Sequence, residues 1–130
     1  MELAIATTVT APFDDAVSRT KAALAEQGFG VLTEIDLSAT LKKKIGAELE
    51  DYVILGACNP PLAHQAVGVD RQIGLLLPCN VVVRASGEGT VTVEAMNPQV
   101  MVQVTDDAGL VPVAEEATTR LRAAIDALGA

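Results

Sequence analysis

Residues 54–83 read ILGACNPPLAHQAVGVDRQIGLLLPCNVVV, and this stretch holds both cysteines and the single histidine of the 130-residue chain. Its apolar first part, which ends at Cys58, predicts a strand buried on both faces. Asn59 followed by proline is typical of a helix start, so we expect a short helix to about Val67. GLLLPCNVVV then predicts the next strand, with Pro78 at its start, at an edge or at a bulge.

The segments on either side predict two long amphipathic helices. Residues 12–27 carry a face at helical spacing formed by Phe13, Val17, Thr20 and Leu24. Residues 112–128 carry a predicted buried stripe of Val113, Ala117, Leu121, Ile125 and Leu128. Each helix must bury its apolar face, and a sheet is the available partner. We therefore expect both helices on the same face of one sheet, with Leu24 and Leu121 buried.

Alternating apolar residues predict three further strands, over residues 3–10, 30–38 and 90–96. In the second of these we expect one face to be shared by Val31, Thr33, Ile35 and Leu37. The strand over 90–96 forms a hairpin with the strand that contains Cys79.

Two segments are ambiguous. Residues 39–49 are compatible with a helical turn or two or with a loop, and residues 98–104 with a strand or a helical turn. The order of elements predicts the α+β fold class, with residues 1–130 forming a single domain. Its two layers are a mainly antiparallel five-stranded sheet and two long helices on one face.

Composition excludes several classes of partner. The net charge of −8 repels nucleic acids and anionic membranes, and the three aromatic residues are too few for base-stacking platforms. No segment has the length and composition of a membrane span or a signal peptide, so we expect a cytoplasmic protein with two free thiols. The basic run Lys42-Lys43-Lys44 is interpreted as a solvated face. The high apolar content suggests a homodimer.

The pieces GACNP, LLLPCNVVV and EAMNP, in this order and spacing, resemble the prokaryotic family called domain of unknown function 302. The resemblance covers nearly the whole chain. It implies a two-layer β-α-β4-α arrangement of the type called TBP-like, and it implies no activity, because the family has none assigned. Other members resemble GNPK where this chain has ACNP, and they lack the cysteine after LP. The resemblance therefore implies that the fold does not need Cys58 or Cys79.

The candidate ligand-binding residues are Cys58, Asn59, His64, Cys79 and Asn80. Antiparallel pairing of the two strands would bring Cys58 and Cys79 to one end of the sheet. Amides at a helix start attract an anion and stabilise a thiolate, which predicts a reactive Cys58. The alternative is a purely structural stretch, in which the cysteines are small core residues, Asn59 is a cap, Asn80 is a turn residue and His64 lies on the surface.

Two functions remain open from the sequence. The first is a domain that binds a small ligand or a partner, with a pocket beside the ACNP turn. The second is a thiol- or metal-dependent protein of sulfur or redox chemistry, in which Cys58, His64 and Cys79 are candidate ligands for a soft metal. One histidine and no clear acid–base pair favour the first. Neither a cofactor nor a substrate can be named from these residues.

Overall fold

We describe the protein from a computed structural model, which covers residues 2–129. Five strands form one sheet in the order β1-β5-β4-β3-β2, and each neighbouring pair is antiparallel. The strands are β1 (Ala4–Thr10), β2 (Gly30–Asp36), β3 (Tyr52–Cys58), β4 (Cys79–Gly87) and β5 (Thr90–Met96). The helices are α1 (Phe13–Glu26), α2 (Leu37–Ile45), α3 (Pro60–Val69), α4 (Gln99–Thr105) and α5 (Val111–Gly129), with short 3₁₀ segments η1 (Arg71–Leu76) and η2 (Ala108–Leu110).

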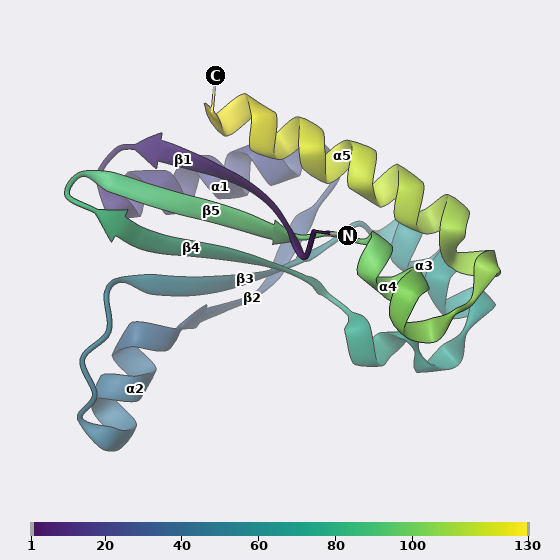
Figure 1. Cartoon of the computed structure of the whole chain (residues 1–130), viewed down its shortest axis with the longest axis horizontal. Helices are drawn as coiled ribbons and strands as arrows, with labels where there is room; N and C mark the ends of the chain where they lie inside the picture. Colours follow the sequence, from purple (N-terminus) through teal and green to yellow (C-terminus); the bar gives the residue numbers. More distant parts are fainter. Residues whose placement is uncertain (1, 130) are drawn as a thin grey trace.

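The two long helices lie side by side on one face of the sheet (Figure 1). They bury Leu24 of α1 and Leu121 of α5 against the inward-facing valines of the central strands, among them Val81 and Val93. The two-layer α+β architecture and the shared helix face are therefore confirmed. The sequence indicates the reason. Apolar residues at helical spacing form one face of each long helix, apolar residues at alternate positions form one face of the sheet, and these two faces bury each other.

The segment before β4 differs from the prediction. We expected the strand to include the leucines that precede Pro78, but residues 71–76 form the 3₁₀ segment η1 and β4 begins at Cys79. The side chain of Asp70 accepts a hydrogen bond from the backbone N–H of Gln72 and starts this turn. Pro78 directly precedes the strand, which agrees with a proline at a strand start.

Both ambiguous segments contain a helix: α2 ends at Ile45, so residues 46–49 form neither helix nor strand, and α4 covers residues 99–105. Asp36 caps α2 by accepting a hydrogen bond from the N–H of Ala39. In α4, the side chain of Asn97 accepts a hydrogen bond from the N–H of Gln99. Both are local side-chain to backbone bonds of the kind that start helical turns.

Strand β2 does not have the single apolar face that was expected. A bulge lies between Val31 and Thr33, so Val31 pairs with Ala57 while Thr33 pairs with Gly56. The extra residue, Leu32, reverses the alternation. Val31 therefore packs against the core on the helix side, whereas Ile35 faces the opposite side and is 47 % exposed.

A second hydrophobic cluster lies beyond one end of the sheet. Its buried members come from α3, η1, α4, η2 and the first turns of α5: Ala66, Ile73, Met101, Leu110, Val113 and Ala114. Helix α5 is long enough to serve both clusters, because its later residues Leu121 and Ile125 belong to the core over the sheet. The seam between the two clusters is where the candidate site lies.

The opposite face of the sheet carries neither long helix (Figure 1). Helix α2 projects beside the sheet, contacts β2 and β3, and contains no buried residue. None of the helices in residues 2–129 combines the length and apolarity needed to cross a bilayer.

Candidate functional site

A cavity of about 240 Å³ occupies the seam between the two hydrophobic clusters. Its walls come from the ends of β2, β3 and β4, from α3, and from α4 and α5. The lining residues are Phe29, Leu32, Ala57, Cys58, Asn59, Leu62, Ala63, Ala66, Leu77, Pro78, Cys79, Met101, Val113 and Ala117. Asn59 is the one residue among them with an amide or charged side chain, so the interior is apolar.

Strand register explains why both cysteines reach this cavity. Ala57 pairs with Cys79, so the end of β3 lies beside the start of β4, and Cys58 is the next residue along β3. Cys58 also pairs with Gly30 on the edge strand β2. Cys79 is buried and Cys58 is half-buried, and both are free thiols. The convergence of ACNP and LPCN at one end of the sheet follows from this register.

Three of the five predicted site residues line the cavity: Cys58, Asn59 and Cys79. His64 and Asn80 do not, and both are exposed. Helix α3 turns Leu62, Ala63 and Ala66 toward the cavity, which leaves His64 on the outer side. Asn80 follows Cys79 on β4 and pairs with Gly56, so the alternation of the strand directs it to the opposite face of the sheet.

The three candidate metal ligands are not gathered. Within residues 2–129, no three His, Cys, Asp or Glu side chains lie close enough together to hold a metal ion. The exposed position of His64 accounts for this, because the two cysteines face a cavity from which His64 is turned away.

The start of α3 has no free amide to offer an anion or a thiolate, contrary to the argument from the sequence. Pro60 and Pro61 occupy the first two helical positions and have no N–H. The N–H of Leu62 donates to the Asn59 side chain at 3.2 Å, and that of Ala63 donates to the Asn59 carbonyl at 2.9 Å. The cap therefore satisfies the first amides of α3 from within the chain, so in the part of the chain that the structure describes this helix start has no free N–H to offer Cys58.

Cys79 is held in its neutral form. Burial raises the pKa of its thiol from the ordinary value of 9.0 to about 11, and the nearby Cys58 adds to the increase through charge repulsion. A protonated thiol is a small, weakly polar group and a poor nucleophile. Near neutral pH, Cys79 belongs to the apolar lining of the cavity.

This shift predicts a pH dependence of stability. Because the pKa of Cys79 is higher in the folded state, its contribution is complete below about pH 9 and is lost as the pH rises toward 11. One pKa unit corresponds to about 1.4 kcal/mol, so the loss is on the order of 2–3 kcal/mol. Urea melts at pH 8 to 11 give the free energy of unfolding at each pH. The values for the parent and for Cys79→Ala should converge as the pH rises, while the values for Cys58→Ala should fall with pH about as steeply as those of the parent. Parallel curves for the parent and Cys79→Ala would contradict the assignment.

Most of the remaining lining could not be recognised in the sequence. Met101, Val113 and Ala117 lie far along the chain from the ACNP turn, and each has an ordinary core pattern. Leu32 reaches the cavity from the bulge in β2. Only the folded chain brings these residues to Cys58 and Cys79.

The fold and site together define a two-layer α+β domain with an apolar cavity at one end of an antiparallel sheet. The family described as "Domain of unknown function DUF302" matches residues 5–128, and the chain belongs to this family. It is similar to the uncharacterized conserved protein DUF302 from Bacillus stearothermophilus, whose crystal structure gives a TM-score of 0.90 at 27% sequence identity. That match covers 98% of this chain and 99% of the other. A search of curated proteins gave no match.

Proposed function

We propose that the protein binds a small apolar molecule in the cavity between its two hydrophobic clusters. The observation that carries the proposal is the lining, in which aliphatic, aromatic and thiol groups surround about 240 Å³ and Asn59 is the one strongly polar side chain. Sites for small ligands are concave, mostly apolar and furnished with few polar groups. The lining fits a binding role better than a catalytic one.

The cavity volume sets the size of the ligand. An engineered cavity of about 150 Å³ holds benzene, which has six heavy atoms, so a cavity of about 240 Å³ corresponds to a ligand of about ten heavy atoms. Large cofactors are far bigger than this. The ligand class that fits is a short alkyl chain or a small ring with a short substituent.

The alternative function, thiol or metal chemistry, has less support. Cys79 is neutral near neutral pH and is therefore a poor nucleophile. The start of α3 has its amides satisfied and does not stabilise a thiolate. His64 points outward and is not available as a metal ligand beside the cysteines. The proposal therefore assigns the cysteines to the wall of a binding site. It also places the protein in the cytoplasm, where both free thiols would stay reduced.

The test is a titration of the purified protein with 1-octanol, followed by amide chemical shifts in NMR. We expect saturable shifts that are largest at Ala66, Cys79 and Ala117. Saturable shifts centred elsewhere on the molecule, or no saturable shifts at all, would refute the proposal.

We further propose that two copies of the chain associate through α2 and through the face of the sheet that carries neither α1 nor α5. Helix α2 has three lysines, no acidic residue and no buried residue, whereas the rest of the chain is strongly acidic. Charge complementarity therefore favours packing of α2 against a second copy. The exposed apolar residues Ile35 and Ile45 are on this side of the molecule, on β2 and at the end of α2.

This assembly predicts a dimer in light scattering at micromolar concentration and low salt. Replacing Lys42, Lys43 and Lys44 by glutamate should weaken dimerisation by at least tenfold, because attraction to the acidic partner becomes repulsion. Substituting Arg71→Glu, a charge reversal on η1, is the control and should leave the dimer intact. A parent mass of 13.4 kDa would refute the assembly.

A further inference from the structure

The turn between α1 and β2 carries a small polar cluster next to the cavity. It consists of Gly28, Asn59 and Arg120. Asn59 lines the cavity, while Phe29 and Ala117, which also line it, are close neighbours of Gly28 and Arg120 along the chain. The cluster therefore adjoins the apolar lining and shares Asn59 with it.

Gly28 keeps two hydrogen-bond donors close together. A Cβ at this position would lie 3.0 Å from Nδ2 of Asn59 and 3.6 Å from Nη1 of Arg120. Both nitrogens thus approach one point above the Gly28 backbone. Gly28 has φ +84°, a left-handed conformation that favours glycine, so the turn keeps this point free of a side chain.

These donors have capacity to spare. The side chain of Asn59 is oriented by its Oδ1, which accepts from the N–H of Leu62, and the hydrogen bonds within residues 2–129 give its Nδ2 no acceptor. Asn59 is 9 % exposed. Arg120 uses Nε for Glu116 at 2.9 Å and Nη1 for the carbonyl of Gln27 at 3.3 Å. A guanidinium has five N–H donors, so most of its terminal donors are free.

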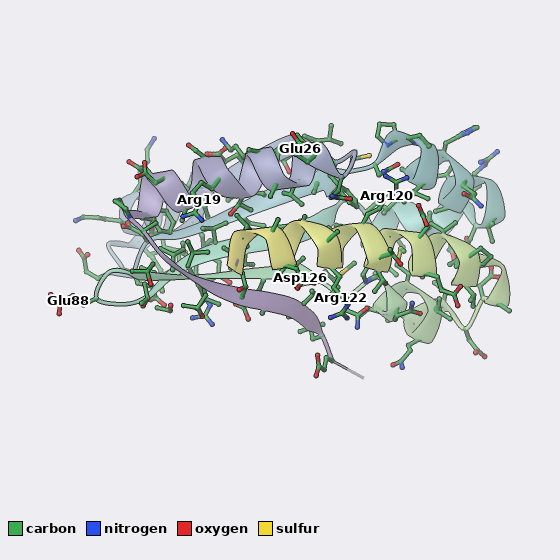
Figure 2. All side chains as sticks on the ribbon, turned by 90° about the horizontal axis from the view of Figure 1, so that it is seen from above. Arg19, Glu26, Glu88, Arg120, Arg122 and Asp126 are labelled. Atoms are coloured by element: carbon green, nitrogen blue, oxygen red, sulfur yellow. The ribbon has the colours of Figure 1, made fainter. Side chains whose placement is uncertain are left out.

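Helix α5 directs Arg120 toward this cluster. Val113, Ala117 and Arg120 follow one another at spacings of four and three residues, so they share one helix face, and the first two line the cavity. Figure 2 shows Arg120 on the side of α5 that faces α1 and α3, with Arg122 on the other side of the helix. Arg120 therefore lies on the same side of α5 as two lining residues, although it does not itself line the cavity.

We infer that the ligand of the proposed site is a small amphipathic acid, with an alkyl body of the size set by the cavity and a carboxylate held by Arg120 and Asn59. This inference rests on the proposed binding function. Beyond the Glu116 carboxylate and the Gln27 carbonyl that Arg120 already contacts, the cluster offers N–H donors, and these select an oxygen acceptor. A guanidinium favours a carboxylate, which can take two of its N–H groups. The net charge of −8 acts against an anionic ligand, so any preference for a carboxylate must arise locally.

The test compares octanoate with 1-octanol, two probes with the same chain length and different head groups, by calorimetry at pH 7.5 and moderate salt. The parent should bind octanoate at least tenfold more tightly than 1-octanol, which is the range expected for hydrogen bonds to a charged group. Arg120→Gln should bind octanoate at least tenfold more weakly than the parent does and should lose this preference. Arg122→Gln removes the same charge from the other side of α5 and should keep the preference.

The outcomes separate the two proposals. Equal affinity of the parent for both probes would overturn the carboxylate assignment and leave the apolar site standing. The same would follow if Arg120→Gln retained the preference, or if Arg122→Gln lost it to the same degree. Binding of neither probe would overturn both. The comparison of octanoate with 1-octanol uses the parent protein alone, so its result does not depend on whether a variant folds.

Discussion

Replacing Leu121 by alanine is expected to lower the free energy of unfolding by about 2–5 kcal/mol, because the change removes a buried side chain and leaves a cavity. Leu121 is 0 % exposed and belongs to the core between α5 and the sheet. Neighbouring strands and α1 hold their positions around it, so the space collapses only in part. Urea denaturation followed by circular dichroism measures the difference directly.

A leucine on the surface provides the matched control. Leu75 in η1 is 84 % exposed, and Leu75→Ala should change the free energy of unfolding by less than about 0.5 kcal/mol. If Leu121→Ala and Leu75→Ala lower the free energy of unfolding by the same amount, Leu121 does not hold α5 against the sheet.

The second large effect concerns ligand binding. Ala117→Leu should weaken the binding of 1-octanol by at least tenfold, because the larger side chain enters the cavity and occupies the volume of the ligand. Ala117 lines the cavity from α5 and is 4 % exposed. Filling a pre-existing space commonly stabilises a protein by about 0.5–2 kcal/mol, so the variant should fold at least as well as the parent. Calorimetric titration gives the affinity, and a thermal melt gives the stability.

The same substitution at an exposed position of the same helix is the control. Ala123 lies on the solvent side of α5, and Ala123→Leu should bind 1-octanol as the parent does. If Ala117→Leu binds normally while remaining folded, the alkyl chain does not occupy this cavity.

The fold was predictable because its local patterns agree with each other. The helical period of α1 and α5 and the alternation in β1, β4 and β5 fit one two-layer arrangement. The bulge in β2 was not predictable, because Leu32 fits a regular alternating strand as well as a bulge, and pairing with β3 decides between them. The 3₁₀ segment η1 was missed for a similar reason, since apolar leucines before Pro78 suit a strand or a turn that packs on a second cluster.

The candidate site was predictable only in part. Register alone brings Cys58 and Cys79 to one end of the sheet, and this much follows from strand order. The contribution of Arg120 depends on the placement of α5 over the turn at Gly28, which no local pattern encodes. By contrast, the sequence already contained the reason that the start of α3 cannot hold an anion. Two consecutive prolines remove two of the amides that such a site needs.

The cavity has a simple architectural origin. One cluster packs the long helices on the sheet, the other packs α3 and α4 around the first turns of α5, and the two meet without closing. Small residues at the seam, including Ala57, Ala66 and Ala117, keep the space open. Larger aliphatic residues at these positions would join the two clusters into one core, so the cavity depends on side-chain size at a few sites.

A crystal structure of the protein with 1-octanol tests the central claim most directly. We predict density for the alkyl chain inside the cavity, between Ala66 of α3 and Ala117 of α5, with Cys79 forming part of the wall. An alkyl chain bound at another surface, or a cavity that stays free of the alcohol at saturating concentration, would contradict it.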